Sequence, residues 1–277
     1  MLKKPFGKTG EKVSEIGLGT FYDARWIILA MLGFRSREER KLEALKVGLE
    51  GGINLIDTAE IYKTEPLVAK AIKGIKREDL FIVTKVWSNH LRREALLKAL
   101  DSSLRRLEVK YVDLYLVHWP NPRVPLSETM GAMEEAVDKG KTRYIGLSNF
   151  SLKQIMEAQE ALRKYEIVSV QLEYNLMNRK VEKDILPYCE RNGIAFMAYY
   201  PLAHGALLKK KDKLKDLCEK YNKTLAQVAL NWLASKEKVF PIPRASNPYH
   251  VKENLGASGW RLSEEDIKKL EELFPLT

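Results

Sequence analysis

Eight short apolar runs recur along the chain, and most are followed by a longer stretch with the apolar spacing of a helix. The apolar runs cover residues 15–20, 54–59, 80–86, 112–119, 144–149, 168–174, 194–200 and 239–245. The helical stretches include 37–50, 92–107, 127–139, 151–163, 182–192, 223–235 and 248–255. Eight strand–helix units in about 250 residues is typical of an α/β fold, the (β/α)8 TIM barrel, which we therefore predict. The alternative, a doubly wound sheet, would need fewer strands or a second domain.

The two ends of the chain lie outside this alternation. The first 14 residues predict a small β-hairpin that closes the barrel floor, and residues 262–274 predict an extra C-terminal amphipathic helix. No linker, low-complexity tract or exact repeat divides the 277 residues. We therefore expect residues 1–277 to form a single barrel domain.

Composition narrows the class of protein. At 45% apolar and 30% charged residues, the chain can bury a large core. No apolar run approaches the ~20 residues that span a bilayer, and the first residues lack the apolar segment of a secretory signal. Cys189 and Cys218 lack metal or redox spacing, so we expect a reduced, cytoplasmic protein without membrane association. Abundant Lys and Glu with little Gln favours a thermophilic source.

The net charge of +10 has three possible meanings: a nucleic-acid partner, an anionic ligand or a lysine-coated surface. The basic residues are spread over many amphipathic segments and alternate with Glu, which argues against nucleic acid. The one dense cluster, "LLKKKDKLKD" at 207–216, is interpreted as a solvated face.

Polar side chains stand at the ends of the predicted strands. Asp57 ends the second run, Lys85 the third and His118 the fourth. Strands of a parallel barrel are covered on both faces, so an unpaired charge there is costly. Barrel enzymes place their chemistry at this rim. Later strands contribute further polar residues at the same end: Ser148, Asn149, Gln171, Tyr199 and Arg244.

The first three of these groups, together with the nearby Tyr62, suggest one chemistry. Asp57 and Lys85 come from neighbouring strands and are expected to pair. Tyr62 lies on the loop above them, where a cation is expected to lower the phenol pKa from its usual value near 10. His118 is placed to hydrogen-bond the same substrate oxygen. Such a set would deliver a proton to a carbonyl oxygen.

Seven motifs in chain order resemble the signatures of the aldo-keto reductases. They are "GINLIDTAEIY", "IVTKVW", "VDLYLVHWP", "YIGLSNF", "VQLEYNLMNR", "AYYPL" and "IPRASNPYHVKENL". The resemblance covers essentially the whole chain. It implies reversible, NAD(P)H-dependent reduction of aldehydes and ketones to alcohols on a barrel that needs no metal.

The resemblance also implies residue roles. Tyr62 would be the general acid, Lys85 would tune it, Asp57 would hold Lys85, and His118 would orient the carbonyl. The nicotinamide would be held by Ser148, Asn149 and Gln171, with Tyr199 stacked on its ring. Arg244 takes the place of a residue that meets the adenosine-ribose phosphate. The remaining cofactor contacts would be Gly19, Thr20, Leu202, Ser246, Asn247, His250, Glu253 and Asn254.

Two positions depart from the family pattern. Lys63 follows Tyr62 where the family usually has Gly, so the tyrosine loop is expected to differ. His250 stands where Arg is frequent, and a neutral His pairs poorly with a 2′-phosphate. Arg244 and Lys252 favour that phosphate, because a guanidinium grips it as a fork. We expect use of NADP or NAD.

The loop at 21–34 is unusually apolar. It is expected to overhang the mouth of the site with Trp87 and Trp119, while Phe21 and Trp26 add aromatic surface for small apolar carbonyl substrates. Its segment "WIILAML" could be a lid, a dimer contact or a membrane-surface patch, and we favour the lid. We expect a monomer or weak homodimer.

Two other kinds of function compete with carbonyl reduction. Lys85 could form a Schiff base in a lyase, but an ion pair with Asp57 keeps the amine protonated. A non-catalytic, dinucleotide-binding redox sensor is possible, although all four proposed catalytic positions are retained. The four histidines and two cysteines show no HxH, HExxH or CxxC spacing, so no metal site is expected. His90 and His204 are expected to be ordinary loop residues.

Overall fold

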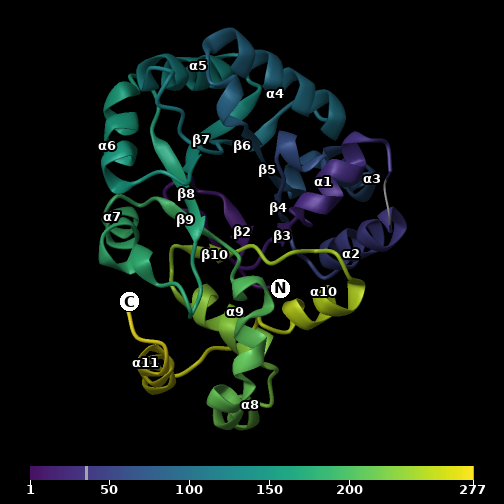
Figure 1. Cartoon of the computed structure of the whole chain (residues 1–277), viewed down its shortest axis with the longest axis vertical. Coiled ribbons are helices and arrows are strands. Elements are labelled where there is room, and N and C mark those ends of the chain that lie inside the picture. The colour runs from purple at the N-terminus through teal and green to yellow at the C-terminus, as the bar shows by residue number, and fades with distance from the viewer. Residues whose placement is uncertain (35–36, 277) are drawn as a thin grey trace.

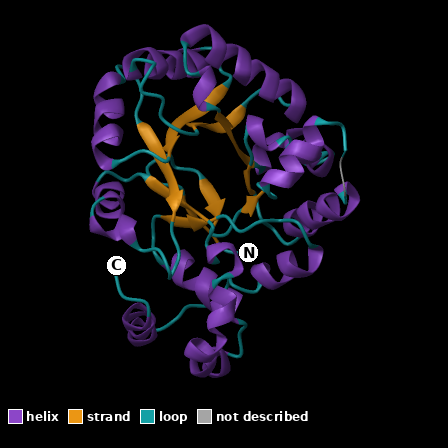
Figure 2. Ribbon diagram, viewed as in Figure 1, coloured by secondary structure: helices purple, strands orange, loops and turns teal. Residues whose placement is uncertain are grey.

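The computed structural model describes residues 1–34 and 37–276. Its centre is a sheet of eight parallel strands in consecutive order from β3 to β10, ringed by helices (Figures 1 and 2). The strands are β3 (Leu18–Gly19), β4 (Leu55–Asp57), β5 (Phe81–Val86), β6 (Val112–Val117), β7 (Thr142–Ser148), β8 (Ile167–Glu173), β9 (Ala195–Tyr199) and β10 (Val239–Pro241). The predicted eight-stranded α/β barrel is confirmed.

The first and last strands close the barrel. Gly19 and Arg244 form a parallel bridge, and the backbone N–H groups of Gly17 and Gly19 donate to Pro241 and Pro243 at 2.9 Å. A Cβ on Gly19 would lie 2.8 Å from the carbonyl oxygen of Ile242. Glycine therefore permits this close backbone approach.

Helices cover the outside of the barrel. They are α2 (Glu38–Glu50), α3 (Glu65–Ile72), α4 (Arg93–Leu107), α5 (Leu126–Asp138), α6 (Leu152–Ala161), α7 (Ile185–Arg191), α9 (Leu225–Ser235) and α10 (Pro248–Leu255). Capping boxes begin α6 and α9: Ser151 pairs with Gln154, and Thr224 with Gln227. The prediction of one helix over 182–192 is wrong, because Asp184 breaks it at φ −148° and ψ −54°.

Three helices were not predicted, namely α3 and the two described next. The apolar loop forms α1 (Ala24–Met31), and α8 (Lys215–Tyr221) follows the lysine-rich run. The expected C-terminal helix is α11 (Glu264–Leu273), which lies with α8 at one end of the molecule (Figure 1). Short 3-10 helices are η1 (Glu60–Tyr62), η2 (Arg77–Asp79), η3 (Ser88–His90), η4 (Lys180–Lys183), η5 (Ala203–Gly205) and η6 (Leu207–Leu214).

The predicted N-terminal hairpin forms the barrel floor. Strands β1 (Lys3–Pro5) and β2 (Lys12–Ser14) pair antiparallel. Phe6, which follows β1, is 0% exposed, and its ring centroid lies 4.6 Å from that of Phe81 and 4.9 Å from that of Phe240. Because both partners belong to the barrel strands, the hairpin seals the barrel interior from below.

No helix among the described residues is long and apolar enough to cross a membrane. The assignment of residues 1–277 to a single domain stays a prediction.

Candidate active site

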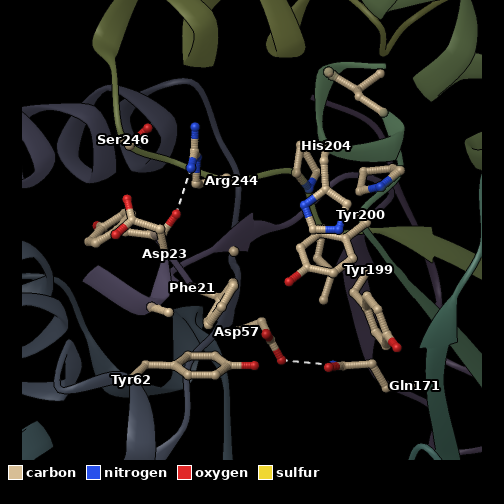
Figure 3. A pocket seen from close by; sticks show the side chains of 18 of the residues that line it. Phe21, Asp23, Asp57, Tyr62, Gln171, Tyr199, Tyr200, His204, Arg244 and Ser246 are labelled. Carbon is tan, nitrogen blue, oxygen red and sulfur yellow. Dashed lines mark hydrogen bonds between the residues drawn. The ribbon is translucent and has the colours of Figure 1, made fainter. Parts of the chain in front are cut away.

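A cavity of about 770 Å³ opens at the carboxyl ends of the barrel strands (Figure 3). Most of the residues predicted for the site line it. They are Gly19, Phe21, Asp57, Tyr62, Trp87, His118, Trp119, Ser148, Asn149, Gln171, Tyr199, Leu202, Arg244, Ser246, His250, Glu253 and Asn254. Sequence-distant strand ends thus contribute to one cavity, as the parallel barrel requires.

Asp57 and Lys85 form the predicted ion pair. The Nζ of Lys85 donates to Asp57 Oδ2 at 2.7 Å and to the carbonyl oxygen of Thr58 at 2.8 Å, and its third N–H faces the hydroxyl of Tyr62 at 3.5 Å. The carboxylate of Asp57 and the carbonyl oxygen of Thr58 both accept from this nitrogen and favour the ammonium form of Lys85. Burial lowers its pKa, and the charge of Asp57 opposes that shift.

Tyr62 and His118 meet over this pair. The Tyr62 hydroxyl lies 3.2 Å from His118 Nε2, and the two rings are edge to face. Burial raises the pKa of Tyr62 well above its usual value, and the charge of Asp57 raises it further. The prediction of a lowered phenol pKa is therefore wrong. Asp57 neutralises the cation that was expected to lower it, and desolvation dominates.

His118 is held neutral. Burial lowers its pKa from 6.5 to about 2, with a further contribution from the charge of Lys85. Its Nδ1 is buried without a hydrogen-bond partner among the described residues. Trp87 packs edge-on against the imidazole, with ring centroids 5.3 Å apart, and so fixes its plane.

Three polar side chains form a cradle beside this group. Gln171 Nε2 donates to Asp57 Oδ1 at 2.8 Å (Figure 3). Because a carboxylate only accepts, the amide must present Nε2 to Asp57, which leaves its Oε1 as a free acceptor. Asn149, with φ 62°, donates to the carbonyl oxygen of His118 at 2.9 Å, and the Tyr199 hydroxyl donates to Asn149 Oδ1 at 2.8 Å. Ser148 Oγ lies 3.1 Å from Asn149 Nδ2.

At the opposite end of the cavity, Arg244 contributes a guanidinium, and Asp23 and Glu253 contribute carboxylates. Arg244 donates to the carbonyl oxygen of Tyr22 at 2.5 Å, which ties it to the segment that follows β3 (Figure 3). His250 Nδ1 lies 3.5 Å from Glu253 Oε2, and the imidazole is 60% exposed. An anionic group that entered this end of the cavity would find a guanidinium.

Besides Lys85, which lies beneath the cavity floor, three predicted residues do not line the cavity: Trp26, Thr20 and Asn247. Trp26 is 4% exposed and packs against Tyr22, with the Nζ of Lys41 4.0 Å from its ring centroid. Its predicted role at the substrate mouth is wrong, because Asp23 caps α1 and the helix turns Trp26 inward. The hydroxyl of Thr20 is bonded to Asp57 O and faces Thr64, and Asn247 caps α10.

Other residues line the cavity without having been predicted there, among them Ile27, Ile61, Tyr200 and His204. The position of Ile27 in the cavity wall could be predicted only if the apolar loop were known to be a helix. The rings of Tyr200 and His204 lie 3.5 Å apart between centroids, and both residues have positive φ, at 48° and 53°. The residue pattern does not indicate left-handed backbone at these side chains, so the sequence gives no reason to place His204 in the cavity wall.

The comparisons with known proteins identify the family of this chain. A model of the Aldo/keto reductase family matches residues 15–274, and the chain belongs to that family. Glyoxal reductase of Bacillus subtilis (strain 168) is 37% identical over 233 residues, or 83% of this chain and 82% of the relative. Methylglyoxal reductase YeaE of Escherichia coli (strain K12) is 33% identical over 267 residues, or 94% and 90%.

Solved structures show the same fold. The thermostable aldo-keto reductase Tm1743, in complex with the inhibitor epalrestat, superposes with a TM-score of 0.90 at 43% identity, covering 99% of this chain and 100% of that one. An aldo/keto reductase from Klebsiella pneumoniae, in complex with NADP and acetate, gives 0.86 at 33% identity, covering 100% and 97%.

Proposed function

We propose that this protein is an NAD(P)H-dependent carbonyl reductase that converts aldehydes and ketones to alcohols reversibly, with Tyr62 as the proton donor. One observation carries the proposal. A protonated phenol lies 3.2 Å from a neutral imidazole and 3.5 Å from a buried ammonium, at the floor of a cavity. A carbonyl oxygen placed there would meet two hydrogen-bond donors at once.

The residues divide the work between them. A reduced nicotinamide, when bound, supplies the hydride. Tyr62 keeps its proton while the substrate oxygen is a carbonyl, because the pKa of the phenol is high. As charge develops on that oxygen, it becomes the stronger base and takes the proton. The phenolate left behind faces the third N–H of Lys85, whose charge stabilises it.

His118 acts as a neutral donor. A neutral imidazole donates through one nitrogen only, and no acceptor faces Nδ1 among the described residues. A proton on Nε2 therefore makes a hydrogen bond, whereas a proton on Nδ1 makes none. His118 would hold the carbonyl oxygen through Nε2 without supplying a charge.

The cradle fits a carboxamide. Gln171 Oε1 is an unused acceptor for an amide N–H, and the hydroxyl of Ser148 and the amide of Asn149 lie within the same wall. These three groups would hold the nicotinamide carboxamide, and Tyr199 would cover the ring. Bound this way, the nicotinamide would present one face to the oxygen site between Tyr62 and His118.

The relatives suggest a substrate class. Two are named for glyoxal and methylglyoxal, so small 2-oxoaldehydes are proposed as substrates. Phe21, Trp87 and Trp119 line the mouth, and Trp119 is 45% exposed. This aromatic surface favours apolar and aromatic aldehydes as well.

NADPH is the proposed principal cofactor. The Klebsiella pneumoniae neighbours are complexed with NADP and NADPH. Arg244 lines the adenosine end of the cavity, and its guanidinium suits a 2′-phosphate. His250 would attract that phosphate less strongly than an arginine would, so NADH is expected to be used as well.

The Schiff-base alternative has little support. Lys85 is 0% exposed and does not line the cavity, and its amine is engaged by Asp57 and Thr58. A substrate carbonyl would have to pass Tyr62 to reach it. A redox sensor that only binds the dinucleotide would not need the arrangement of Tyr62, His118 and the ion pair beneath them.

Three attributes complete the proposal. Cys189 and Cys218 are free thiols, which fits a cytoplasmic location. The thermostable relative at 43% identity supports a thermophilic source. A monomer or weak homodimer stays a prediction.

Nicotinamide absorbance tests the function directly. The purified protein is mixed with NADPH or NADH and with methylglyoxal, an aromatic aldehyde or a simple ketone. We expect carbonyl-dependent oxidation of both cofactors, faster with NADPH. If neither cofactor is consumed with any carbonyl, and borohydride traps a substrate on the protein, the Schiff-base lyase would replace the reductase.

A further inference from the structure

Three buried threonines connect strand ends to the turn that carries Tyr62. Thr20 follows β3, Thr58 follows β4 and Thr64 precedes α3, and each is 0% exposed. Thr64 Oγ1 lies 2.9 Å from Thr20 Oγ1 and 3.0 Å from Thr58 Oγ1. None of the three lines the cavity. They therefore act behind the turn, out of reach of a substrate.

The direction of this hydrogen-bond chain is fixed. Each hydroxyl has one proton, and the chain ends on the carbonyl oxygen of Asp57, which lies 3.0 Å from Thr20 Oγ1 and only accepts. If Thr20 donates there, Thr64 donates to Thr20, and Thr58 donates to Thr64. This is the one arrangement in which all three contacts are hydrogen bonds. A buried chain satisfied throughout is rigid.

The Thr64 side chain takes part in this hydrogen-bond chain and does not cap its own helix. It stands at the N-cap of α3, where a threonine hydroxyl usually accepts from a backbone N–H of the first turn. Here Thr64 makes no side-chain cap bond. The residue before it, Lys63, is left-handed at φ 58°, a conformation that costs a non-glycine residue free energy. Both departures place the Thr64 hydroxyl between Thr20 and Thr58.

The chain brackets the proton donor. Thr58 and Thr64 stand at the two ends of the segment that holds Tyr62, and their hydroxyls join those ends. The carbonyl oxygen of Thr58 also accepts from Lys85 Nζ at 2.8 Å. Thr58, which binds Lys85 through its carbonyl oxygen, is thus hydrogen-bonded through its side chain to Thr64, at the other end of the segment that holds Tyr62. The separation of the phenol oxygen from the ammonium depends on this hydrogen bond.

We infer that Thr64 is a positioning residue, whose hydroxyl holds the Tyr62 turn so that the phenol faces Lys85 and His118. The inference rests on the proposed function, in which Tyr62 gives its proton to a carbonyl oxygen. It also accounts for Lys63. The left-handed residue between Tyr62 and Thr64 reverses the chain so that the threonine reaches back to the strand ends.

The test compares Thr64→Val with Thr64→Ser. Valine keeps the shape but removes both hydrogen bonds, whereas serine keeps the hydroxyl. For Thr64→Val we expect kcat to fall about 10- to 100-fold, the cost of a misplaced catalytic group. The KM for the carbonyl and the Kd of NADPH, measured by fluorescence titration, should change little. Thr64→Ser should restore most of kcat.

Thr142→Val is the matched control. Thr142 begins β7, is 2% exposed, and its hydroxyl donates to the carbonyl oxygen of Tyr144 at 3.0 Å, at the end of the barrel away from the cavity. It should lose thermal stability, as Thr64→Val does, but retain kcat. If Thr64→Val does not fold, Thr20→Val breaks the same chain, and Thr20→Ser should rescue it.

The outcomes separate the two proposals. A Thr64→Val enzyme with wild-type kcat, or a Thr64→Ser enzyme as slow as the valine variant, would overturn the role of Thr64. If Tyr62→Phe is inactive while Thr64→Val is fully active, only this inference fails. If the wild-type protein reduces no carbonyl, the proposed function fails first.

Discussion

Burial governs protonation at the floor of the cavity. Lys85 is 0% exposed, Asp57 3% and His118 6%. Desolvation raises the pKa of Tyr62 and lowers that of His118, so both side chains are neutral at neutral pH. The charged pair of Lys85 and Asp57 lies beneath them. Two neutral donors above an ion pair suit a reaction that creates negative charge on a substrate oxygen.

The neutral state of His118 predicts an acid-sensitive fold. Its pKa is about 2 in the folded protein against 6.5 in the unfolded chain, so the unfolded chain binds the proton first as pH falls. Stability is therefore lost progressively below pH ~6.5, by about 2 kcal/mol at pH 5. His118→Gln should remove this part of the pH dependence. Urea denaturation at pH 8 and pH 5 measures the difference.

His250→Gln is the control for that experiment, because the His250 side chain is 60% exposed. It should leave the pH dependence of wild type unchanged. Equal losses of stability for wild type and His118→Gln between pH 8 and pH 5 would show that His118 is protonated in the folded protein.

The position of some site residues could be predicted from the sequence, whereas that of others could not. Asp57, Lys85 and His118 are recognisable because a polar side chain at the end of a buried apolar run costs free energy unless it is paired or hydrogen-bonded. Thr20 and Asn247 follow the same strand ends, but their hydrogen bonds turn them to Asp57 and α10. The raised pKa of Tyr62 depends on its desolvation, which no residue pattern reveals.

Among the elements, α1 has the clearest division of faces. Trp26 is buried against Tyr22, Ile27 lines the cavity, and Ile28 is 59% exposed. Three successive residues thus meet three environments, as one turn of a helix allows. The lid favoured from the apolar sequence agrees with the position of Ile27, but it does not account for the exposed apolar side chain of Ile28.

Ile27 is predicted to contribute to substrate selection. Ile27→Ala removes apolar surface from the cavity wall, so KM for a bulky aromatic aldehyde should rise roughly 3- to 10-fold, about 1 kcal/mol of lost burial. The Kd of NADPH and the KM for methylglyoxal should change less. Steady-state kinetics with both aldehydes measures the effect.

Ile28→Ala supplies the matched comparison, since it makes the same change one residue further along on the exposed side. It should leave both KM values at wild type. If the two variants behave alike, α1 does not form the wall of the substrate site.

Element prediction failed where local signals were short or ambiguous. The strands and long helices carry many apolar residues at regular spacing, whereas α3 and α1 each span only eight residues. The break before α7 follows from the single side chain of Asp184, which accepts from the backbone N–H of Ile185 and starts a new helix. The apolar spacing over residues 182–192 is not changed by this one residue, so the spacing does not reveal the break.

At the scale of the whole molecule, the barrel separates stability from chemistry. The cavity lies at the carboxyl ends of the strands, and the β1–β2 hairpin seals the other end. Phe6 fills the barrel interior there, between Phe81 and Phe240. Changes at the floor should therefore affect folding without altering the site.

Phe6→Ala tests this separation. Removing a fully buried ring leaves a void and should cost about 3 to 5 kcal/mol of stability, measured by urea denaturation. Under conditions where the variant is folded, kcat and KM should match wild type. A large fall in kcat with intact folding would mean that the hairpin transmits strain to the cavity.

The proton-donating role of Tyr62 is tested most directly by single-turnover oxidation of bound NADPH, on mixing with methylglyoxal, in wild type and in Tyr62→Phe. The substitution removes one hydroxyl from a buried ring. The rate should fall by at least ~10²-fold, as for the loss of a general acid, while the Kd of NADPH stays the same. A Tyr62→Phe protein that reduces methylglyoxal at the wild-type rate would contradict the account, because the proton would then come from another group.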